Sequence, residues 1–496
     1  SRFEEGATQF GGILARLRFE NGTAVTTLPG PPNPILKRKL EELKKAPTTD
    51  ASRSAMAQLE TQQNLTLPVT VRWQRESGAA EIEVDGTTVQ LKAGEWSGWV
   101  PLRFKLNFLL TIHGMIQIHL IRADGELRLY GSPINIDPRN PPIPISTPDN
   151  LAPDLVKQLG LYRTLGWAES SDKPLNEGFL DEAQFLYDSN KAMDDRERLI
   201  MKSLDRNDWD LFVAAIETTD RVSHMMWRLI DETHPMYDAA LAAKYGRAIE
   251  DIYKRADAFV GRLRARVPED AVFIVMSDHG FHSFRRGVNL NTWLVENGYM
   301  TFQGQAGESR KTLADLFGRG RFFEGVDWSA TKAYAVGLGQ IYFNLRGREG
   351  KGVVSSGAEY VALQQEIRTK LLALVDPKDG KPVFRDVYLR DDIYHGEYLA
   401  NGPDLQVGFN DGYRVGWQDT LGGISAAVVE DNLLKWSGDH CATATEISGG
   451  VLFINRPLDP DVAPGIMDLA PTILKLLGVP VPAGLDGKPL MGPKGT

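Results

Sequence analysis

The chain has 496 residues, of which 42% are hydrophobic, and a formal net charge of -9 at pH 7. A chain of this length is too long for one small core, which predicts about two domains. The acidic net charge argues against a general nucleic-acid binder, because neutralising phosphates requires a basic face. The single cysteine excludes an internal disulfide, and no apolar run reaches the roughly 18 residues of a membrane span.

The N-terminal region, residues 1–60, combines a short alternating stretch, a proline-rich break and a charged helical run. We interpret it as the edge of a larger catalytic domain. The chain opens without an initiator methionine, so we expect it to be a fragment of a longer protein.

The next region, residues 61–146, alternates apolar and polar residues and predicts a β-rich insert. Asp-Gly pairs at 85–86 and 124–125 separate alternating runs, which is a strong hairpin signal. The segment 137–146 is rich in proline and predicts a linker. The insert could cap an active site or form a docking surface, and the sequence does not decide between these roles.

From residue 147 to 496 the pattern changes to long helices and short apolar runs. The runs have the bounded, continuous hydrophobicity of parallel strands that are buried on both faces. We therefore predict an α/β fold with a mostly parallel sheet sandwiched by helices, in addition to the antiparallel β-rich insert. The predicted strands lie at residues 211–217, 271–277, 333–338, 404–409 and 450–455.

The first predicted strand of this region leads directly into two chemically active residues. Asp220 and His224 stand four residues apart, so a helix would place both side chains on one face, where one metal ion could bind both. The alternative is an ordinary exposed helix start, with Asp220 as a first-turn acid and His224 as a surface residue. This pair alone does not separate the two interpretations.

Two further loops carry similar residues. Asp278 and His279 follow the apolar run 271–277, and His440 lies in a loop before the run 450–455. A lone histidine in a loop is most often without special function, but ligand sites in open α/β sheets form at strand ends. The five side chains could therefore converge on one site.

The segments ETTDRVSH (217–224), VMSDHGF (275–281), SGDHC (437–441) and DLAPTILKLLGVPVP (468–482) together resemble the alkaline phosphatase superfamily, most closely the type I phosphodiesterase/nucleotide pyrophosphatase family. The resemblance covers roughly residues 150–490 and implies that Asp220, His224 and His440 bind one metal ion, and that Asp278 and His279 bind another. Gly280 would then let the backbone turn away without crowding the second ion. Such a mixed ligand set suits zinc, with manganese or iron as alternatives.

The resemblance also implies a reaction, in which two divalent ions assist in-line phosphoryl transfer through a Ser or Thr nucleophile. No matching nucleophile segment is found in residues 1–60, so we expect it to lie outside this chain, as a missing segment or a second polypeptide. The leading function is hydrolysis of phosphodiester or pyrophosphate bonds in a nucleotide-like small molecule. The alternative is a catalytically inactive or incomplete member that acts as a metal-binding module.

Several aromatic and basic residues lie close to these motifs. Trp227 and Phe281 could line a pocket for the ester group, although packing in the core is the commoner role of such residues. Arg285 and Arg286 could hold a phosphate, but we interpret them as a solvated loop pair. The sequence does not specify the compartment, although many relatives in this family act outside the cytoplasm.

Overall fold

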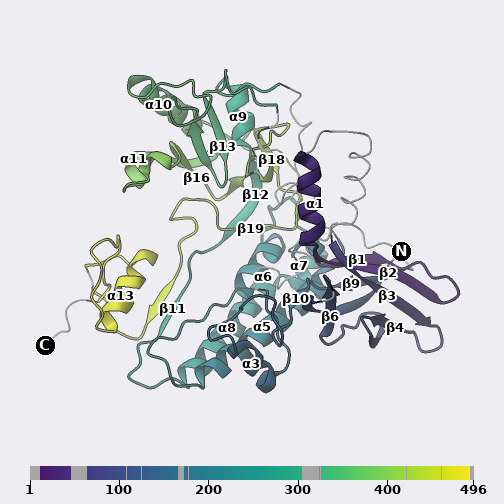
Figure 1. Ribbon diagram of the computed structural model, residues 1–496. Helices are drawn as coiled ribbons and strands as arrows, with labels where there is room; N and C mark the ends of the chain where they lie inside the picture. The colour runs from purple at the N-terminus through teal and green to yellow at the C-terminus, as the bar shows by residue number, and fades with distance from the viewer. Residues whose placement is uncertain are drawn as a thin grey trace. The chain divides into compact units, whose positions relative to one another are not determined.

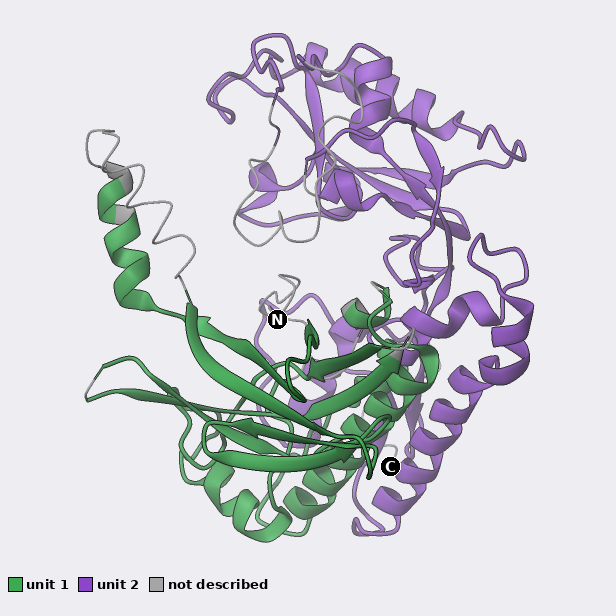
Figure 2. Cartoon of the chain, turned by 90° about the vertical axis from the view of Figure 1, so that its right-hand side faces the viewer, with its two compact units in different colours: residues 1–221 green, residues 222–496 purple. Residues whose placement is uncertain are grey.

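The computed structural model of the protein describes residues 12–45, 64–107, 109–123, 126–165, 172–176, 178–303, 323, 325–420, 422–459 and 461–491. The chain divides into two compact units, residues 1–221 and 222–496 (Figure 2). No helix of the described residues is long and apolar enough to cross a lipid bilayer.

Unit 1 is built mainly from antiparallel strands, which form sheets of order β2-β3-β4-β5, β1-β9-β8 and β10-β7-β6 (Figure 1). The strands are β1 (Ile13–Arg16), β2 (Thr23–Pro32), β3 (Asn64–Gln74), β4 (Ala79–Val84), β5 (Thr87–Lys92), β6 (Val100–Lys105), β7 (Thr111–Ile116), β8 (Ile118–Ala123), β9 (Glu126–Gly131) and β10 (Asn135–Ile136). The helices are α1 (Pro34–Lys45), α3 (Leu151–Leu159), α4 (Asp172–Asn176) and α5 (Glu182–Leu204).

The alternating pattern of this unit produces the predicted antiparallel strands. Along β4 and β5 the register pairs Val84 with Thr87 across the turn. Asp85 and Gly86 both have positive φ, at 47° and 75°, which is the conformation that a two-residue type I′ hairpin requires. This hairpin prediction is confirmed, whereas the second Asp-Gly pair, at 124–125, lies outside the described residues.

Strands from residues 1–60 pair with strands of the β-rich region. Strand β1 pairs with β9, and β2 pairs with β3 over most of its length. Their inward side chains, such as Ile13 and Leu28, join the same hydrophobic core as the strands of the β-rich insert. Each of the two strands alternates apolar and polar residues and therefore has one apolar face. Pairing with a sheet whose apolar face lies on the same side buries that face.

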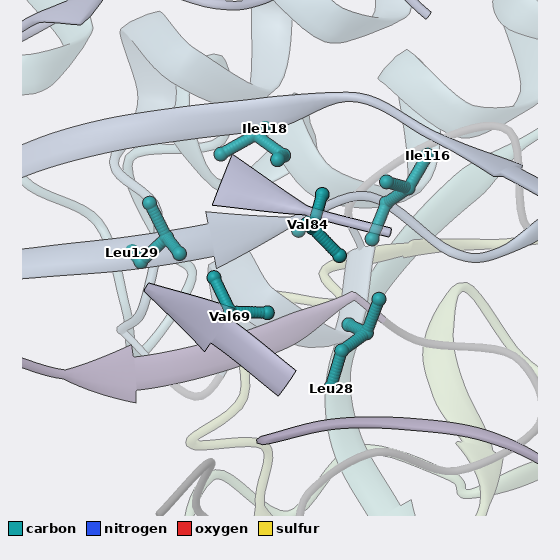
Figure 3. A pocket seen from close by; sticks show the side chains of 7 residues that line it. Leu28, Val69, Val84, Ile116, Ile118 and Leu129 are labelled. Atoms are coloured by element: carbon teal, nitrogen blue, oxygen red, sulfur yellow. The ribbon is translucent and has the colours of Figure 1, made fainter. Parts of the chain in front are cut away.

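The core of unit 1 contains one small apolar cavity of about 10 Å³ (Figure 3). The side chains of Leu28, Val69, Ile116 and Leu129 line it, and Figure 3 shows them directed toward one another from separate strands. A space of this size holds at most one water molecule, and an apolar lining gives that water no partner. This cavity is therefore a small packing gap in the core and not a ligand pocket.

Unit 2 combines helices with several small sheets. Its helices are the last part of α6 (Thr218–Met226), which continues from unit 1, and η1 (Trp227–Leu229), α7 (Ala239–Tyr245), α8 (Ala248–Arg264), α9 (Leu290–Glu296), α10 (Ala358–Leu372), α11 (Arg390–Ile393), η3 (Leu399–Asn401), α12 (Trp417–Thr420), η4 (Ile466–Asp468) and α13 (Leu469–Leu476). Its strands are β11 (Ile274–Met276), β12 (His282–Val288), β13 (Ala333–Val336), β14 (Gln340–Phe343), β15 (Phe384–Leu389), β16 (Leu405–Phe409), β17 (Gly412–Val415), β18 (Val429–Asp431), β19 (Gly438–Asp439) and β20 (Leu452–Ile454).

The prediction of parallel neighbours for these strands is wrong in the described residues, apart from the pair β12 and β17, which the prediction did not include. The strands predicted at 333–338 and 404–409 form β13 and β16 in the antiparallel sheet β13-β14-β16-β15. All five residues of β16 are buried, as its continuous apolar run requires. A run of this kind specifies burial on both faces, but it does not specify the direction of the neighbouring strands.

The other three predicted strands differ further from expectation. Residues 211–217 form no strand, and Val213 is 77% exposed. The predicted strands at 271–277 and 450–455 shorten to β11 and β20, which pair antiparallel with each other, and Phe453 is 65% exposed. In the described residues these side chains are not covered by apolar surface. Extending the strands would therefore gain little packing energy. The helix and sheet content still agrees with an α/β fold at the coarse level.

Arg285 and Arg286 lie in β12, and the interpretation as a solvated loop pair is wrong. Arg286 donates hydrogen bonds from Nε and Nη2 to the two carboxylate oxygens of Asp376, at 2.7 and 2.8 Å. Asp376 is 2% exposed at its side chain and Arg286 12%. Burial opposes ionisation of Asp376, but hydrogen bonds from Arg286 and from the Lys378 backbone hold its pKa below the ordinary value.

We expect Asp376→Asn to lower the free energy of unfolding by about 2 to 4 kcal/mol near neutral pH, because Arg286 then keeps only the more exposed Asp431 as a charged partner. A depressed carboxyl pKa stabilises the fold above the pKa of the unfolded chain, near 4, and this stabilisation disappears as pH falls through the lower folded pKa. The difference in unfolding free energy between wild type and variant, measured by urea unfolding, should therefore become smaller below about pH 4.

The matched control is Asp379→Asn in the same turn, where the carboxylate is 40% exposed and pairs with Lys381 at 2.9 Å. This variant should change the unfolding free energy by less than about 0.5 kcal/mol. Equal effects of the two variants, or a gap that does not depend on pH, would contradict the role given to Asp376.

Candidate metal centre

Helix α6 carries the first pair of predicted ligands. Asp220 lies in its first turn and His224 in its last, so the spacing of four residues places both side chains on one face, as predicted. His224 is 2% exposed, whereas the Asp220 side chain is 28% exposed. The interpretation of His224 as a surface residue is therefore wrong.

The end of α6 is joined to residues 437–440 by a set of short hydrogen bonds. The His224 carbonyl accepts from the Ser437 backbone N–H at 2.7 Å, and the Arg228 backbone N–H donates to Ser437 Oγ at 2.9 Å. His224 Nδ1 lies 2.6 Å from the Gly438 carbonyl oxygen. A carbonyl can only accept, so Nδ1 carries the proton and Nε2 keeps its lone pair for a metal ion.

The structure brings Asp220, His224 and His440 together. Each offers one ligand atom, and these atoms all lie within 4.8 Å of one another. One carboxylate and two imidazoles, of which one is held in the ligating tautomer, fit a divalent transition metal such as zinc.

Asp278 and His279 follow β11 and do not join this three-residue cluster. The His279 ring nevertheless stacks on the His440 ring, with centroids 3.5 Å apart and an interplanar angle of 10°. His279 Nε2 lies 3.5 Å from Asp278 Oδ2, and the Asp278 side chain is 73% exposed. The two donors therefore lie beside the cluster, but they are held less firmly than the donors of α6.

Three residues that sequence reasoning did not select hold the His440 loop. Buried Asp439 accepts from the backbone N–H groups of His440 and Cys441, both at 2.8 Å. Its other oxygen pairs with Arg414 Nε at 2.8 Å and accepts from Trp436 Nε1 at 2.9 Å. Asp439 stands next to His440 in the sequence, but the pattern gives no sign of its contact with Arg414.

Burial opposes ionisation of Asp439, but the Arg414 guanidinium lowers the pKa of this carboxyl well below its usual range. An ionised Asp439 accepts both backbone hydrogen bonds of the loop at Oδ1 and the Trp436 hydrogen bond at Oδ2. Trp436 also covers the metal-centre histidine of α6, with its ring centroid 3.7 Å from that of His224. These contacts hold the loop that carries His440.

Two glycines allow close backbone approach at this site. A Cβ on Gly438 would lie 2.6 Å from the Ser223 carbonyl oxygen, and a Cβ on Gly280 would lie 2.5 Å from the Gly449 carbonyl oxygen. Gly280 also donates its N–H to the Ser448 carbonyl at 2.8 Å. The expected reason for Gly280 was clearance for an ion, and the structure gives a nearer one, which is the backbone of residues 448–449.

We expect Gly438→Ala to disrupt the contact between α6 and the His440 loop, because the added Cβ meets backbone and not a movable side chain. The unfolding free energy should fall by about 1 to 3 kcal/mol, and zinc should bind at least about ten-fold more weakly. Gly261→Ala is the control, since Gly261 lies in α8 with nothing near its Cβ position. That control should gain about 0.5 to 1 kcal/mol, and unchanged zinc affinity in Gly438→Ala would refute the close-approach argument.

Trp227 and Phe281 line an open groove of about 410 Å³ beside this centre. Their rings are 5.9 Å apart and inclined by 21°. The Phe281 ring also approaches the imidazoles of His224, His279 and His440, with centroid distances of 4.9, 5.5 and 5.4 Å. The groove and the imidazoles therefore share one aromatic wall.

Comparison with known proteins identifies a family for this chain. A family model described as type I phosphodiesterase/nucleotide pyrophosphatase matches residues 140–430, which include Asp220, His224, Asp278 and His279 and end before His440. Comparisons with curated proteins and with solved structures gave no match. The family is metal-dependent and belongs to the alkaline phosphatase superfamily. The match spans more than half of the chain, so the protein is a member of the type I phosphodiesterase/nucleotide pyrophosphatase family.

Proposed function

We propose that this chain is the metal-binding part of a hydrolase that cleaves phosphodiester or pyrophosphate bonds in nucleotide-like small molecules. Asp220, His224 and His440 would hold one divalent ion, and Asp278 and His279 would contribute to a second. The single observation that carries the proposal is the convergence of Asp220, His224 and His440 within 4.8 Å, from segments far apart in the sequence. Zinc suits this donor set, with manganese or iron as alternatives.

Bound divalent ions would act as Lewis acids that stabilise charge on the oxygens of a phosphoryl group. The residues of this chain supply orientation. The hydrogen bond from His224 Nδ1 to Gly438 fixes one ligand, and Asp439 holds the loop of another. Trp227 and Phe281 would seat the ester group and reduce its contact with water. We assign the attack on phosphorus to a Ser or Thr hydroxyl supplied from outside these 496 residues.

The second candidate function is an incomplete or inactive member that binds metal and ligand without turnover. The exposed Asp278 side chain favours it, because a carboxylate that is 73% exposed is not preorganised to hold an ion. The same observation predicts two unequal sites, with one ion bound tightly by three donors and one bound weakly by two.

Metal analysis tests the assignment of ligands without depending on activity. After zinc loading and desalting, the wild type should retain about one zinc ion per chain. His440→Ala should retain less than about half of that amount. Asp278→Asn should keep the tightly bound ion. The control is His395→Ala, since His395 is 77% exposed at its side chain and pairs with Asp486 away from the cluster. Equal zinc content in all variants, measured by mass spectrometry of the ions, would disprove this ligand set.

Turnover distinguishes the two candidate functions. With zinc present, the product of the complete gene should release nitrophenolate from bis(4-nitrophenyl) phosphate if the protein is a hydrolase, and His224→Ala should lower the rate at least about 100-fold. If zinc binds with the stoichiometry given above but the ester stays intact, the chain is the metal-binding module of the second candidate.

A further inference from the structure

Strand β8 and the first turn of α5 meet at His119, a histidine that sequence reasoning did not select. His119 lies in β8, pairs with Tyr130 of β9 and is 1% exposed. Trp96 covers the imidazole, with the two ring planes 8° apart and the ring centroids separated by 4.6 Å. All of these residues belong to unit 1, and none of them is a ligand of the candidate metal centre.

Both ring nitrogens of His119 have a defined partner. Nδ1 lies 2.8 Å from the Glu95 carbonyl oxygen, which can only accept, so Nδ1 carries a proton. Nε2 of His119 lies 3.2 Å from the amide nitrogen of the Gln184 side chain. An amide nitrogen can only donate, so Nε2 of His119 is the acceptor and the ring is neutral.

The Gln184 side chain cannot turn around without loss, because its oxygen closes the capping box of α5. Gln184 Oε1 accepts from the Asp181 backbone N–H at 2.9 Å, and Asp181 Oδ1 accepts from the Gln184 backbone N–H at 2.8 Å. These two bonds satisfy donors that a helix start otherwise leaves unpaired. The amide of Gln184 therefore joins the start of α5 to β8, with its oxygen and its nitrogen each committed to one side.

A proton on Nε2 of His119 would place two donors against each other. Rotation of the Gln184 amide would offer its oxygen to the ring, but its NH2 group would then face the Asp181 N–H, and the capping box would open. Movement of the ring away from Gln184 would leave a buried cation without an acceptor. Either response breaks the contact between β8 and the first turn of α5.

Burial is the largest influence on the protonation of His119, and it lowers the pKa of the imidazole below the ordinary value of 6.5. The Glu95 carbonyl and the carboxylates of Asp181 and Asp188 act in the opposite direction. Both carboxylates are already engaged, since Asp181 accepts in the capping box and Asp188 pairs with buried Arg163 at 2.6 Å. The ring is therefore neutral at pH 7 and takes up a proton only below pH 6.5.

The other elements packed against His119 contribute a carbonyl group and uncharged rings. The loop before β6 contributes Trp96 and the Glu95 carbonyl, and β9 contributes Tyr130. The Glu95 carboxylate accepts from the Lys92 backbone N–H at 2.8 Å. The acids that act on the ring thus come from α5, the same helix that the contact holds.

We propose that His119 and Gln184 form an acid-sensitive joint, which holds the first turn of α5 on β8 at neutral pH and releases it in mild acid. This inference lies outside the proposed function and does not depend on it. The release is local, because Arg163 holds α5 further along by donating to Asp188 and to Gln117 Oε1, at 2.6 and 3.1 Å. This second contact contains no histidine, so mild acid leaves it in place.

The lowered pKa of His119 also sets the pH range of this release. A histidine that the fold keeps neutral stabilises its contact fully above the pKa of the free side chain, near 6.5. The stabilisation is lost as pH falls below that value toward the lower folded pKa. In this range the equilibrium for opening the contact should rise by up to about ten-fold for each pH unit.

Hydrogen exchange of the whole chain, followed by mass spectrometry of its peptides, measures this release. After correction for the intrinsic exchange rate, the protection of a peptide over residues 181–187 should fall at least about ten-fold between pH 7.5 and pH 5.0. A peptide over residues 190–202 of the same helix should change less than about two-fold. Unchanged protection of residues 181–187, or equal loss in both peptides from general unfolding, would overturn the proposal.

Gln184→Glu should remove the acid sensitivity without removing the cap. One carboxylate oxygen at this position can accept from the Asp181 N–H, and the other can accept from protonated His119. The protection of residues 181–187 at pH 5.0 should then stay within about three-fold of its value at pH 7.5. The matched control is Gln158→Glu, which adds the same charge at an exposed position of α3 and should keep the wild-type response to acid. A wild-type response in Gln184→Glu would refute the joint.

The titration of the ring itself distinguishes this joint from other acid-sensitive contacts. In NMR spectra of the chain with labelled histidines, the signal of His119 is the one that disappears in His119→Phe, which keeps a ring against Trp96. This signal should titrate below pH 6.5 in the wild type and at least about one pH unit higher in Gln184→Glu. Titration at the same pH in both proteins would contradict the role given to Gln184.

Discussion

The centre depends on the contact between the last turn of α6 and residues 437–440. Its hydrogen bonds use backbone groups on both sides together with the Ser437 hydroxyl and the His224 ring. Backbone groups occupy fixed positions, so this contact places His224 and His440 more accurately than a side-chain contact would. Gly438 makes it possible by removing the Cβ that would strike α6. The positions of both histidines of the metal centre depend on this approach.

Charge inside the fold is arranged around the same region. Asp439 is buried with Arg414, and the pair is satisfied further by Trp436 and by two backbone N–H groups. A buried ion pair often contributes little to net stability, but it restricts the geometry of what surrounds it. Here the restricted element is the loop that presents His440. The acid next to the histidine thus serves to position it.

Structural features that depend only on residues close together in the sequence could be predicted. The Asp85-Gly86 hairpin follows from conformations that these residues adopt readily, and the shared face of Asp220 and His224 follows from the period of a helix. The grouping of both with His440 was predicted from loop positions, and the structure places the three side chains together. Whether they bind a metal ion remains a prediction.

Features that depend on distant partners could not be predicted in this way. The run that forms β16 specified burial, but its neighbours β14 and β15 run antiparallel, which no residue of the run determines. The segment 211–217 has a strand-like composition, yet Val213 is largely exposed and the segment remains irregular. The pairing of Arg414 with Asp439 likewise depends on tertiary contacts that leave no periodic signal in the sequence.

The shared aromatic wall has a consequence for how such a protein can change its selectivity. Phe281 touches three imidazoles, so a substitution there alters the metal centre and the groove together. Asp411 and Glu446 also line the groove and are more than half exposed, and Glu446 pairs with Arg385 outside it. A substitution at position 281 therefore affects metal binding together with substrate choice, whereas substitutions at positions 411 and 446 can change substrate choice alone. Among proteins with this site, sequence differences should concentrate at positions 411 and 446, while the aromatic wall stays constant.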